Sequence, residues 1–391
     1  MIPRYEPTYS FTEIHQSFLQ ALRNNRTDIL EASLREYFKV KHVFLMRSGR
    51  SSLFVILKAL NKPGKVLMPA YNCRNVPESA WFAGYSPMLL DPDLETLNVP
   101  PERYLNRLTE DVSAIFAISL FGIPYDVRPL VDAARHKGIL LVEDAATAMG
   151  SRVGGRLTGT IGDVGVISFQ DTKLLSAHTG GVIITNNDQI AQKIAAFLED
   201  VPRENEIWRN YLSTLFHKAA TRHWVYPFTQ FAHRVLNGEA MYEIVSPPMK
   251  TAPGYLARCS AFSTGLIMNQ WRNLDWNISR RRWIAGQYKQ ALAGREVFRF
   301  PTIADEIEPV WIQYPLLIER KFEFYKYMQK RGVDIIWSHR YSCAEEFHQD
   351  DCPTAEIIAR SILSLPCYPG LSDVEVEKIC QIAQEYANKF G

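Results

Sequence analysis

The sequence predicts an α/β fold in which a large domain, built on a mostly parallel sheet of seven strands, is followed by a smaller α+β domain. Two observations lead to this expectation. The chain has 391 residues, which is more than one hydrophobic core usually serves. Residues 43–187 also alternate short β-rich runs with helix-like segments, the pattern of a parallel sheet covered by helices. We therefore expect a large domain at residues 1–250 and a small domain at residues 251–391.

Seven β-rich runs are the expected strands of the large sheet. They are residues 43–47, 65–69, 87–91, 114–120, 139–143, 164–168 and 181–185, with helices between them at 51–60, 76–83 and 127–136. In the small domain we expect strands at 311–318 and 333–337 and helices at 278–292, 321–331, 354–362 and 373–389. Because open α/β sheets bind their ligands beyond the strand ends, the loops after these strands form the candidate site.

Composition and charge argue against several classes of protein. The formal net charge is +2 and the pI is about 8.1, too balanced for a nucleic-acid footprint across the whole chain. The six cysteines are scattered, without a CxxC pair or histidines at zinc-ligand spacing, so we expect reduced thiols and no metal site. No basic stretch followed by an apolar run occurs at the N-terminus. We expect a cytoplasmic protein.

Residues 203–250 differ from the rest of the large domain because they show no alternation of strands and helices. Residues 207–238 contain no acidic side chain, although they contain several arginines and histidines. Apolar residues recur there at helical spacing beside the basic ones; they are Trp208, Tyr211, Leu212, Leu215, Phe216 and Ala219. Two interpretations stay open. The segment is either a helix on a membrane surface or a helical excursion packed on its own enzyme or on a partner subunit.

The densest chemical signal lies between residues 142 and 185. Asp144 follows an apolar strand, Ser168 ends the next strand, and Lys173 comes five residues later. Taken singly, such an aspartate is often a helix cap and such a lysine is usually solvated. Their order, however, matches a site for pyridoxal 5'-phosphate (PLP), in which an acid pairs with the pyridine nitrogen, a hydroxyl binds the phosphate and a lysine forms a Schiff base. We predict these roles for the three residues.

A second group of residues suits a phosphate. Gly49, Arg50 and Ser51 follow a predicted strand and open a predicted helix. A glycine lets backbone amides approach an anion, a helix N-terminus carries partial positive charge, and an arginine adds a fork of donors. The plainer interpretation is an ordinary capped helix start.

These residues belong to a longer ordered set, through which the sequence resembles the DegT/StrS family of PLP-dependent sugar aminotransferases, with the fold type I aminotransferase architecture. The resemblance covers residues 38–387 apart from 203–250. Its motifs are SGRSSL at 48–53, MPAYNC at 68–73, GYSPMLLDPD at 84–93, LFGIP at 120–124, EDAATAMGS at 143–151, SFQDTK at 168–173 with the following TGGVIIT, and DCPTAEIIARSILSLPCYPGLSD at 351–373.

The resemblance implies an enzyme that transfers an amino group, usually from glutamate, to a keto carbon of a nucleotide-linked deoxysugar. Lys173 resembles the Schiff-base lysine and proton shuttle of such enzymes, and Asp144 resembles the partner of the pyridine nitrogen. Ser168 and the turn at residues 49–51 resemble the phosphate-binding groups. The family also implies a homodimer with the site at the subunit interface.

Four positions depart from the family pattern. Arg50 stands where a threonine is usual, Cys73 where an aromatic residue stacks on the cofactor ring, and Thr147 where a glutamine is usual. Leu256 takes the place of an asparagine that reaches the neighbouring subunit's phosphate. We hypothesise that Arg50 supplies the lost phosphate contact. The expected catalytic residues are Lys173 and Asp144, and the expected cofactor-binding residues are Gly49, Arg50, Ser51, Cys73, Asp144, Thr147, Ser168 and Lys173.

Other functions were weighed against this one. Relatives that use PLP for sugar dehydration replace the lysine with histidine, so Lys173 argues against dehydration. An aminotransferase acting on a non-sugar cyclic ketone stays open, because substrate choice depends on variable loops. A regulator that kept the fold and lost turnover is the alternative outside the enzyme class.

Overall fold

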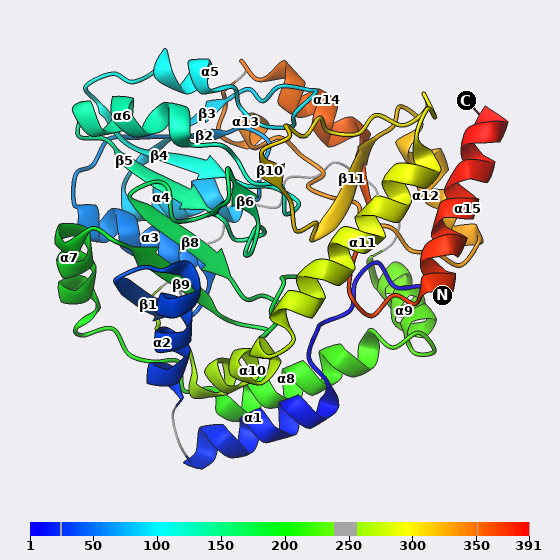
Figure 1. Ribbon diagram of the computed structural model, residues 1–391, viewed down its shortest axis with the longest axis horizontal. Helices are drawn as coiled ribbons and strands as arrows, with labels where there is room; N and C mark the ends of the chain where they lie inside the picture. Colours follow the sequence, from blue (N-terminus) through cyan, green and yellow to red (C-terminus); the bar gives the residue numbers. More distant parts are fainter. Residues whose placement is uncertain (24–25, 238–255, 350, 391) are drawn as a thin grey trace.

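The computed structural model describes residues 1–23, 26–237, 256–349 and 351–390. It confirms the α/β class, with a seven-stranded sheet in the order β1-β9-β8-β5-β4-β2-β3. Neighbouring strands pair in parallel from β3 to β8, whereas β9 runs antiparallel to both β8 and β1. The sheet forms the centre of the larger part of the molecule, and a smaller C-terminal part lies at one side of it (Figure 1).

All seven predicted strands are present. They are β1 (His42–Met46), β2 (Lys65–Pro69), β3 (Ser86–Leu90), β4 (Val112–Ile118), β5 (Leu140–Asp144), β8 (Val164–Ser168) and β9 (Gly181–Thr185). Every residue of β4, β5, β8 and β9 is buried. Strands covered on both faces read as continuous apolar runs, which explains why these segments were recognisable in the sequence.

Helices cover both faces of the sheet. The three expected helices are α3 (Gly49–Leu60), α4 (Asn75–Ala83) and α6 (Arg128–His136), and four more are α1 (Phe11–Arg23), α2 (Thr27–Phe38), α5 (Pro101–Leu105) and α7 (Asp188–Leu198). One face packs against α3, α4 and α7, while α5 and α6, together with α1 and α2, cover the other. Three short strands form a separate small sheet; they are β6 (Arg152–Val153), β7 (Arg156–Leu157) and β10 (Ile307–Glu308).

The C-terminal part has the expected α+β character. Its helices and strands are α11 (Leu274–Leu292), β11 (Gln313–Leu317), α12 (Lys321–Lys330), α13 (Cys343–Glu346), α14 (Pro353–Ser361), β12 (Ile362–Pro366) and α15 (Asp373–Phe390). β11 and β12 pair antiparallel as a two-stranded sheet. Tyr288, Phe324 and Tyr386 lie fully buried between this sheet and the helices, so this part has an apolar core of its own.

The predicted strand at residues 333–337 is wrong. This segment makes only two isolated bridges, one from Val333 to Ile2 and one from Ile336 to Ser364. Its second residue, Asp334, is buried, and the Asp334 carboxylate accepts hydrogen bonds from the hydroxyls of Tyr226 and Tyr325. The segment thus touches β12 at Ile336 without extending the ladder that β12 forms with β11.

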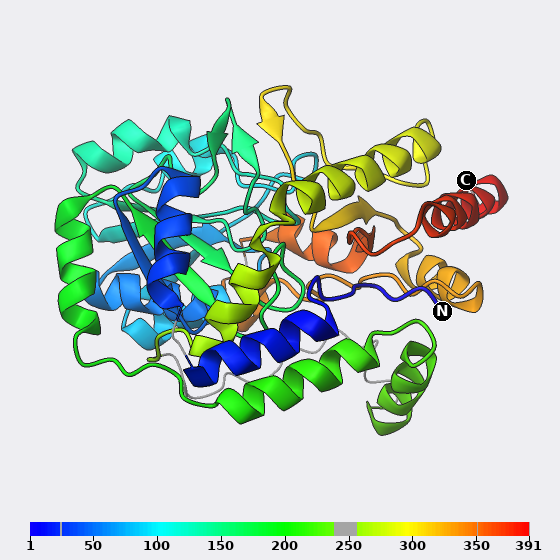
Figure 2. The same ribbon diagram turned by 60° about the horizontal axis from the view of Figure 1, so that its bottom comes forward.

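Residues 207–237 are helical, as expected. They form α8 (Ile207–Ala220) and α9 (Tyr226–Asn237), and α10 (Ala261–Trp271) follows later in the chain. Figure 2 shows α1 and α8 running side by side along one edge, with α9 beyond one end of α8. The expected domain boundary at residues 250 and 251, together with residue 238 and the end of the 203–250 excursion, lies outside the described residues.

Candidate active site

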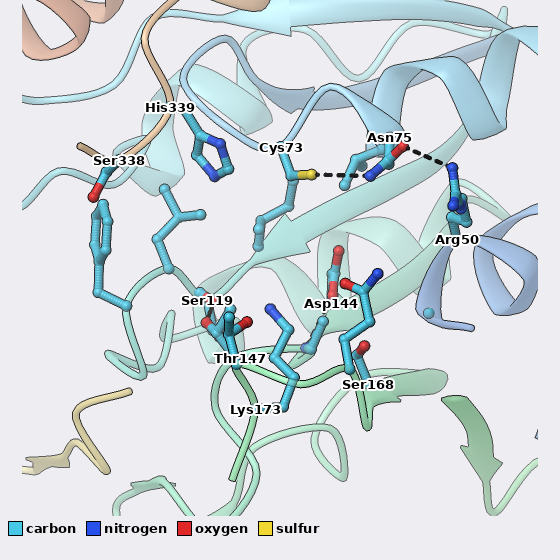
Figure 3. A pocket seen from close by; sticks show the side chains of 18 of the residues that line it. Arg50, Cys73, Asn75, Ser119, Asp144, Thr147, Ser168, Lys173, Ser338 and His339 are labelled. Atoms are coloured by element: carbon cyan, nitrogen blue, oxygen red, sulfur yellow. Dashed lines mark hydrogen bonds between the residues drawn. The ribbon is translucent and has the colours of Figure 1, made fainter. Parts of the chain in front are cut away.

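A cavity of about 340 Å³ lies at the carboxyl ends of β4, β5 and β8. Loops after these strands form one wall, the starts of α3 and α4 form a second, and residues of the C-terminal part close a third. Figure 3 shows Lys173, Asp144 and Ser168 on one side, with Cys73, Asn75 and Arg50 across from them. The volume and the mix of apolar and polar lining residues suit a small cofactor.

Lys173 reaches this cavity from the loop that follows β8. Its backbone N–H donates to the carbonyl of Gln170 (2.8 Å), which closes a turn and aims the side chain inward. Burial lowers the pKa of the amine, while the nearby Cys73 and Asp144 act in the opposite direction. The ammonium nitrogen makes no hydrogen bond to another described residue. An amine held in this way is more often neutral and therefore more nucleophilic than an exposed lysine.

Asp144 is the last residue of β5, so its side chain emerges at the edge of the sheet beside Lys173. Its carboxylate accepts the backbone N–H of Ala146 (3.0 Å). Burial raises the pKa of Asp144, and the Ala146 N–H and Lys173 partly offset that shift. Burial therefore favours the neutral amine of Lys173 and the neutral carboxyl group of Asp144, which is typical of a functional site that binds a ligand.

The N-terminus of α3 opens into the same cavity. Ser48 caps the helix, because its hydroxyl accepts the backbone N–H of Ser51 (3.2 Å). A Cβ added at Gly49 would lie 3.3 Å from the Cβ of Ser168, so a glycine lets this backbone approach the end of β8. Gly49, Arg50 and Ser168 line the cavity. Their arrangement suits an anion, since a helix N-terminus, a hydroxyl and a guanidinium converge.

The remaining predicted residues occupy different places. Cys73 and Thr147 line the cavity. The Cys73 sulfur accepts a hydrogen bond from the side-chain amide of Asn75 (3.4 Å), and the Thr147 hydroxyl donates to the carbonyl of Ser119 (2.6 Å). The side chain of Ser51 is fully buried, with its hydroxyl 2.8 Å from that of Ser48. Ser51 therefore serves the helix cap, and only its neighbours face the cavity.

Sequence reasoning missed the wall contributed by the C-terminal part. Gln313, Trp337, Ser338 and His339 line the cavity opposite the sheet. Burial and the proximity of Lys173 lower the pKa of His339 to about 4, so this imidazole is neutral at pH 7. The sequence did place His339 just after an expected strand. It gave no sign that His339 meets the loops of Asp144 and Lys173, which lie more than 150 residues earlier in the chain.

A buried polar cluster supports the lysine loop from behind. Asp171 accepts a hydrogen bond from the hydroxyl of Tyr9 (2.8 Å), lies 2.9 Å from Nδ1 of His178 and pairs with Nδ1 of His217 at 3.1 Å. These histidines hold the pKa of Asp171 well below its usual value despite its burial, and Asp171 in turn raises the pKa of His178. The cluster joins α8 and the N-terminal segment to the loop that carries Lys173.

Comparisons with known proteins identify the family of the chain. A family model described as the DegT/DnrJ/EryC1/StrS aminotransferase family matches residues 9–384. The chain belongs to this family. The resemblance inferred from the motifs is thereby confirmed, and so is the prediction of an aminotransferase.

Members of the aminotransferase family match along most of the chain. GDP-perosamine synthase of Vibrio cholerae is 23% identical and the match covers 99% of this chain and 100% of the relative. A dTDP-3-amino-3,4,6-trideoxy-alpha-D-glucose transaminase of Streptomyces venezuelae is 24% identical, with 92% and 86% covered. The crystal structure of S. venezuelae DesV in complex with a ketimine intermediate superposes with a TM-score of 0.80 at 21% identity, covering 100% of this chain and 99% of that one.

In this aminotransferase, replacing Lys173 with methionine should stabilise the protein when no cofactor is bound. The pKa of Lys173 is lower in the folded protein than in the unfolded chain. The folded wild type therefore loses stability at pH values below the pKa that this lysine has in the unfolded chain. We expect Lys173→Met to gain about 1 kcal/mol of unfolding free energy at pH 7, and the gain should shrink as the pH approaches 10. Urea unfolding at several pH values measures it.

Lys321 provides the matched control. It is also buried with a pKa lowered to about 7, but its ammonium donates to the carbonyl of Ala359 (2.7 Å) and lies 4.7 Å from the Trp337 ring centre. Lys321→Met loses those contacts and should destabilise the protein. A destabilised Lys173→Met variant at pH 7 would show that the Lys173 amine is satisfied in the folded state, contrary to this account.

Proposed function

We propose that this chain is a PLP-dependent aminotransferase that moves an amino group from an amino acid, with glutamate as the expected donor, to a keto carbon of a nucleotide-linked deoxysugar. One observation carries the proposal: the buried amine of Lys173 and the carboxylate of Asp144 face a cavity that also receives a helix N-terminus. The named relatives support the substrate class, since one is a GDP-perosamine synthase and another a dTDP-sugar transaminase.

The residues present fit the cofactor. Lys173 would hold the aldehyde carbon, Asp144 the pyridine nitrogen, and the start of α3 with Ser168 the phosphate. When bound, PLP withdraws electrons from the carbon that bears the amino group. Asp144 would keep the ring nitrogen protonated, and Lys173 would take a proton from one carbon and return it to another. The wall at residues 336–339 would limit the access of water to this exchange.

The spectrum of the protein tests the proposal directly. Purified protein supplied with PLP should show a visible absorbance band that the Lys173→Ala variant lacks. Added glutamate should bleach the band and release 2-oxoglutarate, because the amino group then stays with the cofactor. Lys193→Ala on α7 is the control, since Lys193 is exposed and lies outside the cavity lining. If PLP gives no band with the wild type, the proposal is wrong.

The acceptor requires a separate measurement. With nitrogen-labelled glutamate as the donor, nucleotide-linked keto sugars should gain the label faster than cyclic ketones that carry no nucleotide. If only the cyclic ketones gained the label, the protein would still be an aminotransferase, but its acceptor would be a non-sugar ketone. The homodimer remains a prediction from the family resemblance, and the cytoplasmic location remains a prediction from the cysteines and the N-terminal sequence.

Arg50 is proposed to strengthen the hold on the phosphate. It lies in the first turn of α3 at the cavity, and its guanidinium donates to the side-chain oxygen of Asn75 (3.1 Å), which keeps it near the opening. Arg50→Gln should weaken PLP binding by about ten-fold, as expected for one charge-assisted contact. Absorbance titration measures this, with Arg135→Gln on the distant α6 as the control. Unchanged affinity in Arg50→Gln beside weakened affinity in Ser168→Ala would contradict the role.

A further inference from the structure

Helix α8 exposes one apolar stripe, although other apolar residues of the same helix pack inward. Ile207, Tyr211 and Leu215 are partly buried against the core beneath it. Asn210, Thr214 and Lys218 lie on its buried side, with at most 6% of each residue exposed. Trp208, Leu212 and Phe216 point outward, with exposed fractions of 62%, 58% and 73%. A surface helix normally buries its apolar stripe and exposes its polar residues. The exposed residues recur every four positions, so they form one continuous stripe.

Specific polar contacts fix this orientation. On the inner side, the Ser213 hydroxyl lies 3.0 Å from Nε2 of His178, and His217 pairs with Asp171 in the cluster below the lysine loop. The Lys218 ammonium donates to Glu6 at 2.7 Å. Turning the helix to bury its aromatic stripe would break all three contacts and leave a carboxylate and an ammonium unpaired in the interior. The outward position of the stripe therefore follows from the polar contacts on the inner side of α8.

The apolar surface continues beyond α8. After the turn that ends this helix, Trp224, Phe228 and Phe231 are exposed to 77%, 73% and 70%. On α1, which runs alongside α8, Leu19 and Leu22 are about half exposed (Figure 2). Single exposed apolar residues are ordinary, but a group of this size that includes two tryptophans marks a surface that contacts something else.

Basic side chains outnumber acidic ones on this surface. Among the described side chains of α1, α8, the turn after α8 and α9, the exposed charged residues are Arg23, Arg209 and Arg222. The acid on α1, Glu13, is buried where it accepts the N–H of Ser10. One exposed acid, Glu206, flanks the start of α8 and pairs with Arg209 at 2.9 Å. Aromatic residues beside arginines favour the interface of a bilayer that contains anionic lipid.

We propose that the outer surface of α1, α8 and α9 binds the surface of an anionic phospholipid bilayer, with α8 lying in the plane of the interface. The stripe from Trp208 to Phe216 inserts among the headgroups and upper acyl chains, while Arg209 and Arg222 meet lipid phosphates. No helix in the described ranges is long and apolar enough to cross a membrane, so the attachment is peripheral.

A second copy of the chain fits this surface less well. A two-fold contact would place the same patch on both partners, so the arginines of one would face those of the other with little acid to pair with them. A bilayer of anionic lipid presents the opposite charge and has no fixed shape to match. We therefore infer that a bilayer, and not a second copy of the chain, binds this surface; the experiment below also detects self-association.

Co-sedimentation with vesicles tests the proposal on the full-length, PLP-loaded protein. Vesicles of phosphatidylcholine mixed with phosphatidylglycerol should bind the wild type, whereas vesicles of phosphatidylcholine alone should bind it weakly. The triple variant Trp208→Ser, Leu212→Ser, Phe216→Ser should lose at least about ten-fold in bound fraction, because three apolar side chains no longer insert. Its PLP absorbance should match that of the wild type, since the changed residues lie outside the cavity. Its thermal midpoint should fall only slightly, because Leu212 and Phe216 are exposed and Trp208 loses one edge contact with Phe18.

A matched control changes two exposed apolar residues elsewhere. Trp276 on α11 and Val374 on α15 are 59% and 74% exposed, and Trp276→Ser with Val374→Ser should leave vesicle binding unchanged. Equal binding by the triple variant and the wild type would overturn the proposal. It would also be overturned if the wild type ignored anionic vesicles while the triple variant dissociated an oligomer in sedimentation velocity, which would assign the surface to a second copy.

Discussion

Burying an amine in a protein costs free energy unless a charge or a hydrogen bond compensates, and the site at Lys173 is organised around that cost. The lysine nitrogen lies in the cavity near the carboxylate of Asp144, and burial pushes both groups toward their neutral forms. The sheet creates this arrangement, because β5 and β8 end at the same edge and bring Asp144 and Ser168 together there. A bound cofactor with an aldehyde, a basic ring nitrogen and a phosphate would satisfy all of these groups together.

The polar cluster behind the site relates the catalytic loop to the outer surface of the molecule. Asp171 and His178 flank Lys173 in the chain and are held by His217 and Ser213 of α8. The inner side of α8 thus carries polar residues that hold the loop and apolar residues that pack on the core. Trp208, Leu212 and Phe216 are left on the outside. Helix α8 therefore accounts for two observations: the loop that carries Lys173 is held from behind, and an apolar stripe is exposed on the outer side.

Much of the fold and of the site could be predicted from the sequence, for physical reasons that also explain the failures. β4 and β5 are buried on both faces and read as unbroken apolar runs, and the residues at strand ends, such as Asp144, follow from them. The strand expected at residues 333–337 is absent, and the long-range contacts of Asp334 and Ile336 there are not contained in a local pattern. His339 reaches the cavity from the other side of the molecule for the same reason. Periodicity showed that residues 207–220 carry an apolar stripe, but it could not show that Tyr211 and Leu215 pack inward while Phe216 stays exposed.

The central claim is that one lysine, Lys173, binds the cofactor covalently. Borohydride reduction of the PLP-treated protein, followed by peptide mapping with mass spectrometry, tests this most directly. The account predicts that the reduced cofactor is found on the peptide containing Lys173 and is absent from that of Lys321, the other buried lysine with a lowered pKa. Cofactor fixed on a different lysine, or no fixed cofactor at all, would contradict the account.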